Sequence, residues 1–440
     1  MYELMDELYP ITRSITGEGV RKTLKIIQNF IDLKIHEVPS GTKVFDWTVP
    51  QEWNIRDAYI MNDKNEKIID FRKSNLHVAQ YSKKIKKRIK LNELKKHIFT
   101  LPDQPNAIPY VTSFYNENWG FCMSNNQFQK LNDDEYIVNI ESEHKNGSLT
   151  YGEFVIEGES KEEILISTYV CHPSLCNDNL SGPVLATFLA EYLSKQKLHY
   201  SIRFLFIPET IGAITWLALN EDKIKNIFHG LVATCVGDSG ISTYKKSRDG
   251  NNIIDEVVIE VLKESGKPYK IMDFWPSGSD ERQYCSPAFN LPVGSLMRTP
   301  YDMFEEYHTS EDNLSFMNKE CLADSFFKYL SVIQKLEGNF NYVKPEKITL
   351  ENKKSVKNNP VFLNLFPKCE PRLGKRKIYE EIGGVKNQDS LKQKKAIQWI
   401  LNLSDGKHSL RDIQERSGLE FDMLFDMANL LENKKLLSHV

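Results

Sequence analysis

Hydrophobic and polar positions divide the chain into segments of different periodicity. Apolar residues recur at helix-like spacing through residues 1–35. Between residues 38 and 132 this periodicity fades, and short β-rich pieces such as 44–49 alternate with turn clusters. We therefore predict a mainly β domain at 41–130, inserted after the first helices.

After Glu135, apolar runs of strand length alternate with helical periodicity. The run at 164–170 is rich in apolar residues, which is typical of a strand buried on both faces. The predicted strands are 136–140, 151–156, 164–170, 202–207, 230–236 and 292–296, and the predicted helices are 181–193, 212–224, 253–264 and 319–336. This alternation predicts an α/β domain with a mostly parallel central sheet and functional residues at the carboxyl ends of its strands.

Signals of order weaken after the last of these helices. Residues 341–385 are predicted to be a linker with a few apolar anchors, among them Val361 and Phe362. Residues 386–440 are predicted to form a separate small unit. Its predicted helices are 391–401, 410–417 and 421–432. Three short helices of this kind are typical of a helix-turn-helix or winged-helix module.

Composition narrows the class of protein without indicating a function. The 440 residues include 57 basic and 60 acidic ones, and the net charge of -3 argues against a protein that covers nucleic acid or an anionic membrane. No apolar run reaches the ~18–20 residues that cross a bilayer. The amino terminus carries acids where a secretory signal would be basic, and the seven cysteines include no CxxC pair. We therefore expect a cytoplasmic protein with free thiols.

Candidate chemistry lies where the predicted strands end. His172 and Asp178 are six residues apart in the loop that follows the strand at 164–170. A loop histidine is most often a hydrogen-bonding residue, but imidazole and carboxylate are also ligand types that zinc accepts. Glu209 ends the next strand, where it could be an acid at a helix N-terminus or a general base that takes a proton from water.

The later strands carry further candidates. Cys235 and Asp238 lie at the end of the strand at 230–236, and His308 follows the strand at 292–296. Because the carboxyl ends of parallel strands meet at one edge of a sheet, we expect these side chains to lie near those of the preceding strands.

The order of these motifs resembles that of zinc aminopeptidases of the bacterial leucyl aminopeptidase type (clan MH), whose fold glutaminyl cyclases share. The matching motifs are His172, Asn177-Asp-Asn-x-Ser-Gly, Pro208-Glu-x-x-Gly, Asp238 and Tyr307-His-Thr-x-x-Asp, with a weaker match at Ser279-Asp280 and Phe289. The resemblance implies a three-layer αβα core at 1–40 and 131–340.

A closer resemblance is to a bacterial subfamily of aminopeptidase-like proteins with a β-rich inserted domain and a C-terminal winged-helix domain, here 386–440. Its hallmarks are Tyr9-Pro-Ile-Thr-Arg-Ser-Ile-Thr-Gly-Glu-Gly, Phe45-Asp-Trp-Thr-Val-Pro, Trp119-Gly-Phe-Cys and Cys171-His-Pro-Ser-Leu. Together these motifs span most of the chain.

The resemblance implies a role for each matching residue. His172 and His308 would bind a metal ion, and Asp178 would be the carboxylate that bridges two metals in the family. Glu209 would be the general base for a metal-bound water.

Two departures from the family pattern change the expected metal site. Thr210 stands where the family has a second Glu that binds the other metal, and Ser174 stands where the family reads His-x-Asp. Asp238 is a further candidate ligand, with Cys235 as a rival for the same place. Because a hydroxyl is a poor zinc ligand beside a carboxylate, we expect one zinc ion per chain, held by the two histidines and the shared carboxylate.

Substrate contacts are less marked in the sequence. Arg13, Tyr284 and Arg298 lie in segments that could border the pocket, and an arginine there could hold a carboxylate or phosphate. For each of the three, the alternative is a structural role.

We expect zinc-dependent hydrolysis of a peptide or amide bond near a free amino terminus, in a peptide or small amide substrate. The alternatives are a cyclase- or transferase-like non-peptidase, and a pseudo-enzyme scaffold with a structural zinc and partner-binding flanking domains.

In the C-terminal unit, the stretch from Leu410 to Glu420 carries more acidic than basic residues, whereas phosphate contacts need positive charge. Glu415 and Glu420 lie where recognition of DNA would favour Lys or Arg. We therefore expect this unit to support a homo-oligomer or a protein partner, and we expect neither nucleic acid nor a membrane as a partner.

Overall fold

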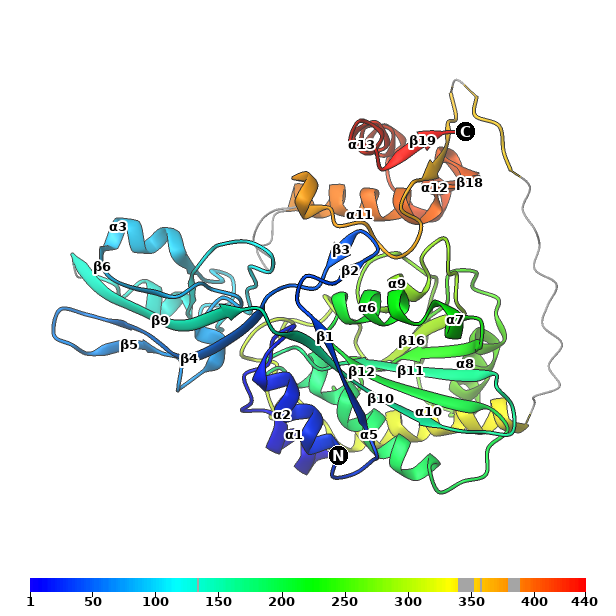
Figure 1. The fold of residues 1–440 in the computed structure, drawn as a ribbon, viewed down its shortest axis with the longest axis horizontal. Coiled ribbons are helices and arrows are strands. Elements are labelled where there is room, and N and C mark those ends of the chain that lie inside the picture. The colour runs from blue at the N-terminus through cyan, green and yellow to red at the C-terminus, as the bar shows by residue number, and fades with distance from the viewer. Residues whose placement is uncertain (133, 339–351, 357, 379–387) are drawn as a thin grey trace.

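The core of the computed structural model is a mixed eight-stranded sheet (Figure 1). The structure describes residues 1–132, 134–338, 352–356, 358–378 and 388–440. In spatial order the strands are β1 (Lys34–Pro39), β10 (Ser148–Ile156), β12 (Ser201–Ile207), β11 (Glu163–Tyr169), β13 (Ile227–Val232), β16 (Val293–Met297), β14 (Ser242–Lys245) and β15 (Tyr269–Met272).

The predicted parallel arrangement is confirmed at the centre of this sheet. β12, β11, β13 and β16 are parallel neighbours, and every residue of β11 and β12 is buried. Antiparallel pairings join β1 to β10, β10 to β12 and β14 to β16. The carboxyl ends of the central strands therefore lie at one edge, which is where the candidate chemistry was expected.

Helices cover both faces of the sheet and give three layers (Figure 1). One face packs against α1 (Tyr2–Leu8), α2 (Glu18–Ile27), α5 (Ser181–Leu193), α8 (Ile253–Glu264) and α10 (Lys319–Gly338). The other face packs against α6 (Ile211–Leu219), α7 (Glu221–Ile224) and α9 (Glu281–Tyr284). Helices on both faces explain why the central strands are apolar throughout rather than alternating.

A second sheet extends to the left of the core in Figure 1. Its order is β5 (Lys67–Asp70), β4 (Glu52–Met61), β9 (Glu135–Lys145) and β6 (Ile85–Lys90). β9 alternates buried and more exposed residues, as a strand does when one face covers a small core of its own. β9 begins after residue 130, where the predicted insertion ends.

Shorter elements complete this region. They are β2 (Lys43–Val44), β3 (Trp47–Thr48), η1 (Asn75–His77), α3 (Leu91–Leu94), η2 (Lys95–His97), β7 (Ile98–Phe99), β8 (Phe121–Cys122) and α4 (Asn125–Phe128). β2 and β3 pair with each other in a small hairpin, which brings Trp47 toward the core.

The C-terminal unit combines three helices with a three-stranded sheet. The helices are α11 (Gln388–Leu403), α12 (Leu410–Ser417) and α13 (Phe421–Asn433), and the sheet order is β18 (Asp405–Ser409), β17 (Val361–Asn364) and β19 (Leu437–His439). Ser409 caps α12 by accepting a hydrogen bond from the backbone of Asp412, and Gly418 ends the helix in the left-handed region. β17 lies within the stretch predicted as a linker.

The C-terminal unit docks on the core through a buried arginine. Arg248 Nε donates to Asn402 Oδ1 at 2.9 Å, and Arg248 Nη2 lies 3.1 Å from Asp405 Oδ2. After β17 the described chain runs against the core at residues 368–376, with a turn at η4 (Gly374–Arg376). Within the part of the chain that the structure describes, no helix has the length and apolarity that a membrane span requires.

Candidate metal centre

Two histidines and an aspartate meet at the carboxyl edge of the central sheet. His172 follows β11, Asp178 lies in the turn at Cys176–Leu180 (η3) that leads into α5, and His308 lies in the loop after β16. One potential ligand atom of each residue lies within 4.8 Å of the other two. The predicted convergence of these three residues is therefore present in the fold.

The geometry of the three side chains fits a metal ion. Asp178 Oδ2 lies 3.0 Å from His308 Nε2 and 3.8 Å from His172 Nε2. Apart from this approach to each other, neither Asp178 Oδ2 nor His308 Nε2 has a hydrogen-bond partner among the described residues, although both atoms are buried. Buried polar atoms without a partner cost free energy, which a cation bound between them would recover. Two imidazoles and a carboxylate also match the three protein ligands of a catalytic zinc site.

A second set of hydrogen bonds fixes the turn that carries Asp178. Asp178 Oδ1 accepts a hydrogen bond from the Tyr169 hydroxyl. The backbone N–H groups of Asn177 and Asp178 donate to the carboxylate of Asp312 at 2.6 and 2.9 Å. Burial raises the pKa of Asp312 to about 8. Asp312 is thus a positioning residue for the turn, and it closes the motif that begins at Tyr307.

Burial and the neighbouring charges determine the protonation states of His172 and Asp178. Burial, and then the nearby His308 and Arg13, lower the pKa of His172 to about 4, although Asp178 acts in the opposite direction. Burial alone would raise the pKa of Asp178, but the two histidines and the Tyr169 hydroxyl hold it below its ordinary value. A neutral imidazole and an ionised carboxylate are the forms that bind a metal ion.

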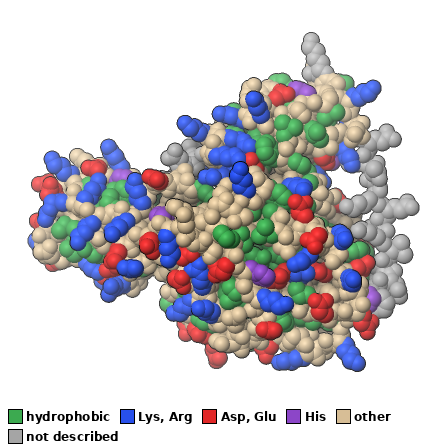
Figure 2. Space-filling model, in the orientation of Figure 1, with side chains coloured by type: hydrophobic (Ala, Val, Ile, Leu, Met, Phe, Trp, Pro, Cys, Tyr) green, Lys and Arg blue, Asp and Glu red, His purple; other side chains and the backbone are tan. Residues whose placement is uncertain are grey.

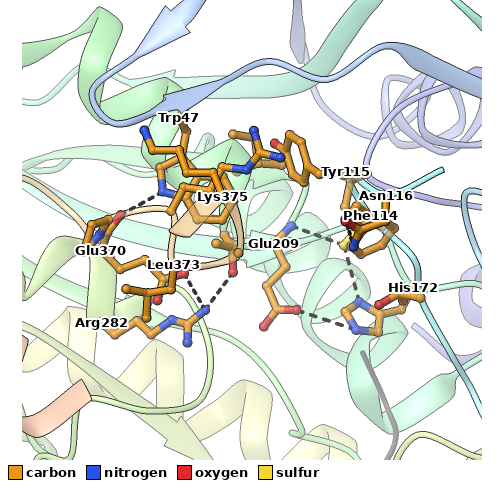
Figure 3. A pocket seen from close by; sticks show the side chains of 18 of the residues that line it. Trp47, Phe114, Tyr115, Asn116, His172, Glu209, Arg282, Glu370, Leu373 and Lys375 are labelled. Atoms are coloured by element: carbon orange, nitrogen blue, oxygen red, sulfur yellow. Dashed lines mark hydrogen bonds and ion pairs between the residues drawn. The ribbon is translucent and has the colours of Figure 1, made fainter. Parts of the chain in front are cut away.

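Glu209 lies beside the centre at the end of β12. Its Oε2 atom is 3.7 Å from His172 Nε2, and its backbone N–H donates to Cys171 Sγ at 3.2 Å (Figure 3). Burial, followed by the negative charges of Asp280 and Asp178, raises the pKa of Glu209 well above its ordinary value. A carboxylate with a raised pKa next to potential metal ligands is suited to accept and return a proton.

Thr210 adopts a left-handed backbone with φ of 62°. Its N–H donates to Asp280 Oδ1 at 2.6 Å, and its hydroxyl accepts a hydrogen bond from Arg282 Nη2 at 3.0 Å. A guanidinium therefore contacts the position at which the resembled family has its second metal-binding carboxylate. Its positive charge opposes a second cation there.

Asp238 and Cys235 lie outside the cluster of potential ligands found among the described residues. Asp238 Oδ2 accepts hydrogen bonds from Asn177 Nδ2 at 2.9 Å and from the Thr299 N–H at 3.0 Å. Cys235 is buried beside Met297, and burial raises the pKa of its thiol well above the ordinary value. Both side chains are thus engaged with the framework around the centre.

The three candidate substrate contacts are also buried in the framework. Arg13 Nε donates to the carbonyl oxygen of His172 at 2.8 Å, and the hydroxyls of Tyr284 and Ser167 are 2.9 Å apart. Arg298 Nε donates to the carbonyl oxygen of Gly240 at 2.8 Å. None of the three lines the cavity beside the centre. Arg13 acts on the centre indirectly, by fixing the backbone of a candidate ligand.

A cavity of about 580 Å³ opens beside Glu209 (Figure 3). The core, the segments before β9 and the segment at 370–375 each supply part of its wall. The lining residues are Ile15, Trp47, Tyr110, Thr112, Phe114, Tyr115, Asn116, Cys171, His172, Glu209, Thr210, Ile211, Arg282, His308, Glu370, Pro371, Arg372, Leu373, Gly374 and Lys375.

Most of this wall was missed by reasoning from the sequence. Trp47 lies in the Phe45-Asp-Trp-Thr-Val-Pro motif, which was recognised without a role, and Arg372 begins a basic run inside the predicted linker. Tyr110 has no motif of its own, yet its ring centroid lies 5.2 Å from that of His172 and 5.0 Å from that of His308. Only the fold brings such distant segments to one cavity.

Comparisons with known proteins agree with this architecture. A family model described as a domain of unknown function (DUF4910) matches residues 2–339, and a winged helix-turn-helix model matches residues 360–439. A relative from Clostridium acetobutylicum is 55% identical over 440 residues, covering 100% of this chain and 96% of the relative. It is named "Putative polysaccharide biosynthesis protein with aminopeptidase-like domain".

Solved structures show the same fold. A "putative peptidase" from Clostridium acetobutylicum has a TM-score of 0.76 at 54% identity, covering 100% of this chain and 96% of that one. BSAP, a zinc aminopeptidase from Bacillus subtilis, has a TM-score of 0.57 at 12% identity, covering 76% of this chain and 93% of that one. A Peptidase M28 precursor from Shewanella amazonensis has a TM-score of 0.53 at 13% identity, covering 77% and 92%.

Proposed function

The chain belongs to the family described as a domain of unknown function (DUF4910), and on that premise we propose that it is a single-zinc hydrolase of a peptide or amide bond near a free amino terminus. The observation that carries the proposal is the convergence of His172, Asp178 and His308 beside Glu209. The zinc aminopeptidase from Bacillus subtilis shares the fold and adds an argument by analogy, while the site itself carries the proposal.

Each residue of the centre has a part in this proposal. His172, Asp178 and His308 would hold the zinc ion, which when bound polarises a carbonyl group and lowers the pKa of water. Glu209 would take a proton from the attacking water and return it to the leaving amine. The Tyr169 hydroxyl and Arg13 would keep the ligands in place through Asp178 and the backbone of His172.

A single ion is supported by the surroundings of Thr210. Its hydroxyl accepts a hydrogen bond from Arg282, so a guanidinium stands beside the position at which the resembled family has its second metal-binding carboxylate. Three protein ligands around one ion leave an open position for water and substrate.

The cavity beside Glu209 indicates a small substrate. Its volume of about 580 Å³ suits a short peptide or a small amide rather than a folded protein. The name of the Clostridium acetobutylicum relative refers to polysaccharide biosynthesis, which favours an amide on a sugar derivative as a second candidate substrate. A transferase or cyclase acting on such a derivative would use the same ligands and the same base.

Metal analysis combined with one substitution tests the proposal. We expect about one zinc ion per purified chain, and we expect Glu209→Gln to keep the ion while lowering release from aminoacyl amides by about 10²–10⁴-fold. Glu305→Gln is the matched control, because Glu305 is exposed and lies outside the cavity that Glu209 lines. Elemental analysis and release of the free amine are the two measurements.

The possible outcomes separate the candidate functions. A chain without zinc, or activity that is indifferent to Glu209→Gln, would rule out the hydrolase. Zinc retained without any turnover of amides, esters or sugar derivatives would favour a scaffold with a structural ion. Acyl transfer to an added amine instead of water would favour the transferase.

A further inference from the structure

One wall of the cavity comes from the segment that follows the first strand of the C-terminal unit. In Figure 3, Glu370, Leu373 and Lys375 lie on the far side of Glu209 from His172. Hydrogen bonds hold this segment to the hairpin of β2 and β3. Trp47 Nε1 donates to the Glu370 carbonyl oxygen at 2.8 Å, and a backbone N–H of the same segment donates to Asp46 at 2.8 Å. The wall is therefore fixed in place.

Positive charge dominates this wall. Arg282, Arg372 and Lys375 all line the cavity. Arg282 Nη2 lies 3.2 Å from Glu370 Oε1, and Lys375 Nζ lies 2.6 Å from Asp46 Oδ1. Among the described residues, no carboxylate pairs with the guanidinium of Arg372. Figure 2 also shows Lys and Arg side chains gathered where the core meets the C-terminal unit.

Arg372 is held by an aromatic ring. Its guanidinium carbon lies 4.1 Å from the ring centroid of Tyr115, which lines the same cavity. Tyr115 is fixed in turn, because its hydroxyl donates to the Thr48 carbonyl oxygen at 3.3 Å and its ring packs edge-on to Trp47. A guanidinium that stacks on a ring keeps the N–H groups along its edge for hydrogen bonds to an anion.

We propose that Arg372 binds an anionic group, a carboxylate or a phosphate, on the part of the substrate that lies away from the metal centre. The proposal rests on the proposed function and narrows its substrate class to acidic peptides or acidic amides. A planar fork of donors matches the two oxygens of a carboxylate, and a phosphate offers the same arrangement. The alternative is that Arg372 only clamps Tyr115, in which case the charge of the substrate makes no difference.

Two uncleavable probes test the proposal on the full-length chain as purified. They are the reduced leucyl derivatives of 4-aminobenzoate and 4-aminobenzamide, in which a methylene replaces the amide carbonyl. The two probes have nearly the same shape and differ in one negative charge. We expect calorimetry to give at least about tenfold tighter binding of the benzoate, as for a hydrogen-bonded ion pair. The comparison needs no turnover, so a failure of the hydrolase proposal is seen separately.

Substitutions assign the preference to one side chain. Arg372→Met should abolish the preference for the benzoate, and Arg372→Lys should keep part of it because the charge remains without the fork. Lys377→Met is the matched control, since Lys377 is exposed, lies five residues further on and does not line the cavity. Equal affinity of the wild type for both probes, or a full preference in folded Arg372→Met, would overturn the proposal.

Two further measurements cover a variant that fails to fold and distinguish a carboxylate from a phosphate. If Arg372→Met does not fold, the wild-type preference and its reduction in Arg372→Lys decide the question. A phosphonate in place of the carboxylate distinguishes the two anions. Tighter binding of the phosphonate than of the benzoate assigns a phosphate-bearing substrate, and the reverse order assigns a carboxylate.

Discussion

At the scale of single residues, a carboxylate is available to bind a metal ion only if its oxygens are not already used in hydrogen bonds to the surrounding protein. Asp178 has one oxygen that faces only the two candidate histidines, whereas Asp238 uses both of its oxygens on the surrounding framework. The two aspartates are similarly buried, with 1% and 2% of their surfaces exposed. Hydrogen bonding, rather than burial, therefore separates a candidate ligand from a structural carboxylate.

This difference gives a prediction for the two aspartates. Asp178→Asn should lower zinc affinity by more than about 100-fold, because the proposed ligand loses its charge. Asp238→Asn should retain zinc and instead lower the free energy of unfolding by about 1–3 kcal/mol, because Asn177 and Thr299 would lose an acceptor. Elemental analysis after dialysis and urea unfolding are the measurements. Loss of zinc in Asp238→Asn alone would place the ion elsewhere.

The candidate residues of the centre could be predicted from the sequence, but the residues that form the cavity wall could not. His172, Asp178, Glu209 and His308 could be found because each follows a strand of the central sheet, and parallel topology brings strand ends together. Arg372 could not be found in this way, because its position depends on how the chain crosses the core after β17. No periodicity encodes that path.

At the scale of elements, one arginine links the first helices to both sheets. Arg21 on α2 lies 3.0 Å from Glu37 on β1 and 2.5 Å from Glu52 on β4. The hydrogen bond from Arg21 and the one from Asn54 outweigh burial and lower the pKa of Glu52 to about 2, from an ordinary value of 4.5. Glu52 is almost fully buried in the structure.

A prediction about acid stability follows from the lowered pKa of Glu52. In the folded chain Glu52 stays ionised to a lower pH than in the unfolded chain, so its contribution is complete above about pH 4.5 and is lost as the pH falls toward 2. Arg21→Gln should lower the free energy of unfolding by about 1–3 kcal/mol at pH 7 and by less at pH 3. Urea unfolding at the two pH values measures the difference. An equal loss at both would contradict the linkage.

Helices were predicted more closely than short strands. The predicted bounds of α5, α8 and α12 agree with the structure, and α8 and α12 carry capping residues at their starts, Asn252 and Ser409. β14 and β15 were missed, because four residues are too few to display a period. β17 was read as part of a linker for the same reason: its pairing with β18 and β19 is set by contacts distant in sequence.

At the scale of the whole molecule, the last two helices of the C-terminal unit carry more acidic than basic residues. Glu415, which lies where recognition of DNA would favour Lys or Arg, is on α12, and the third helix, α13, contains Asp422, Asp426 and Glu432 but neither Lys nor Arg. Phosphate contacts need positive charge on the helix that approaches the groove. We therefore propose that this unit serves protein contacts, either between copies of this chain or with another protein.

The corresponding prediction is that the full-length chain does not bind duplex DNA. Fluorescence anisotropy with a labelled duplex should give no binding tighter than about 10⁻⁴ M at physiological salt. A double variant, Asp422→Lys with Asp426→Lys, should gain weak binding that disappears at higher salt. Salt-dependent binding by the wild type would show that another surface contacts the duplex.

The hydrogen bond from Trp47 to Glu370 joins residues 323 positions apart. A ribosome has synthesised the three candidate metal ligands and Glu209 when it has passed residue 308, but the wall at 370–375 does not yet exist at that point. Contacts between such distant residues also form late in folding, because a long loop must close first. A chain interrupted between these positions would carry every residue of the candidate centre without the segment that we propose selects the substrate. The order of synthesis thus places the candidate centre ahead of the wall that we propose binds the anionic group.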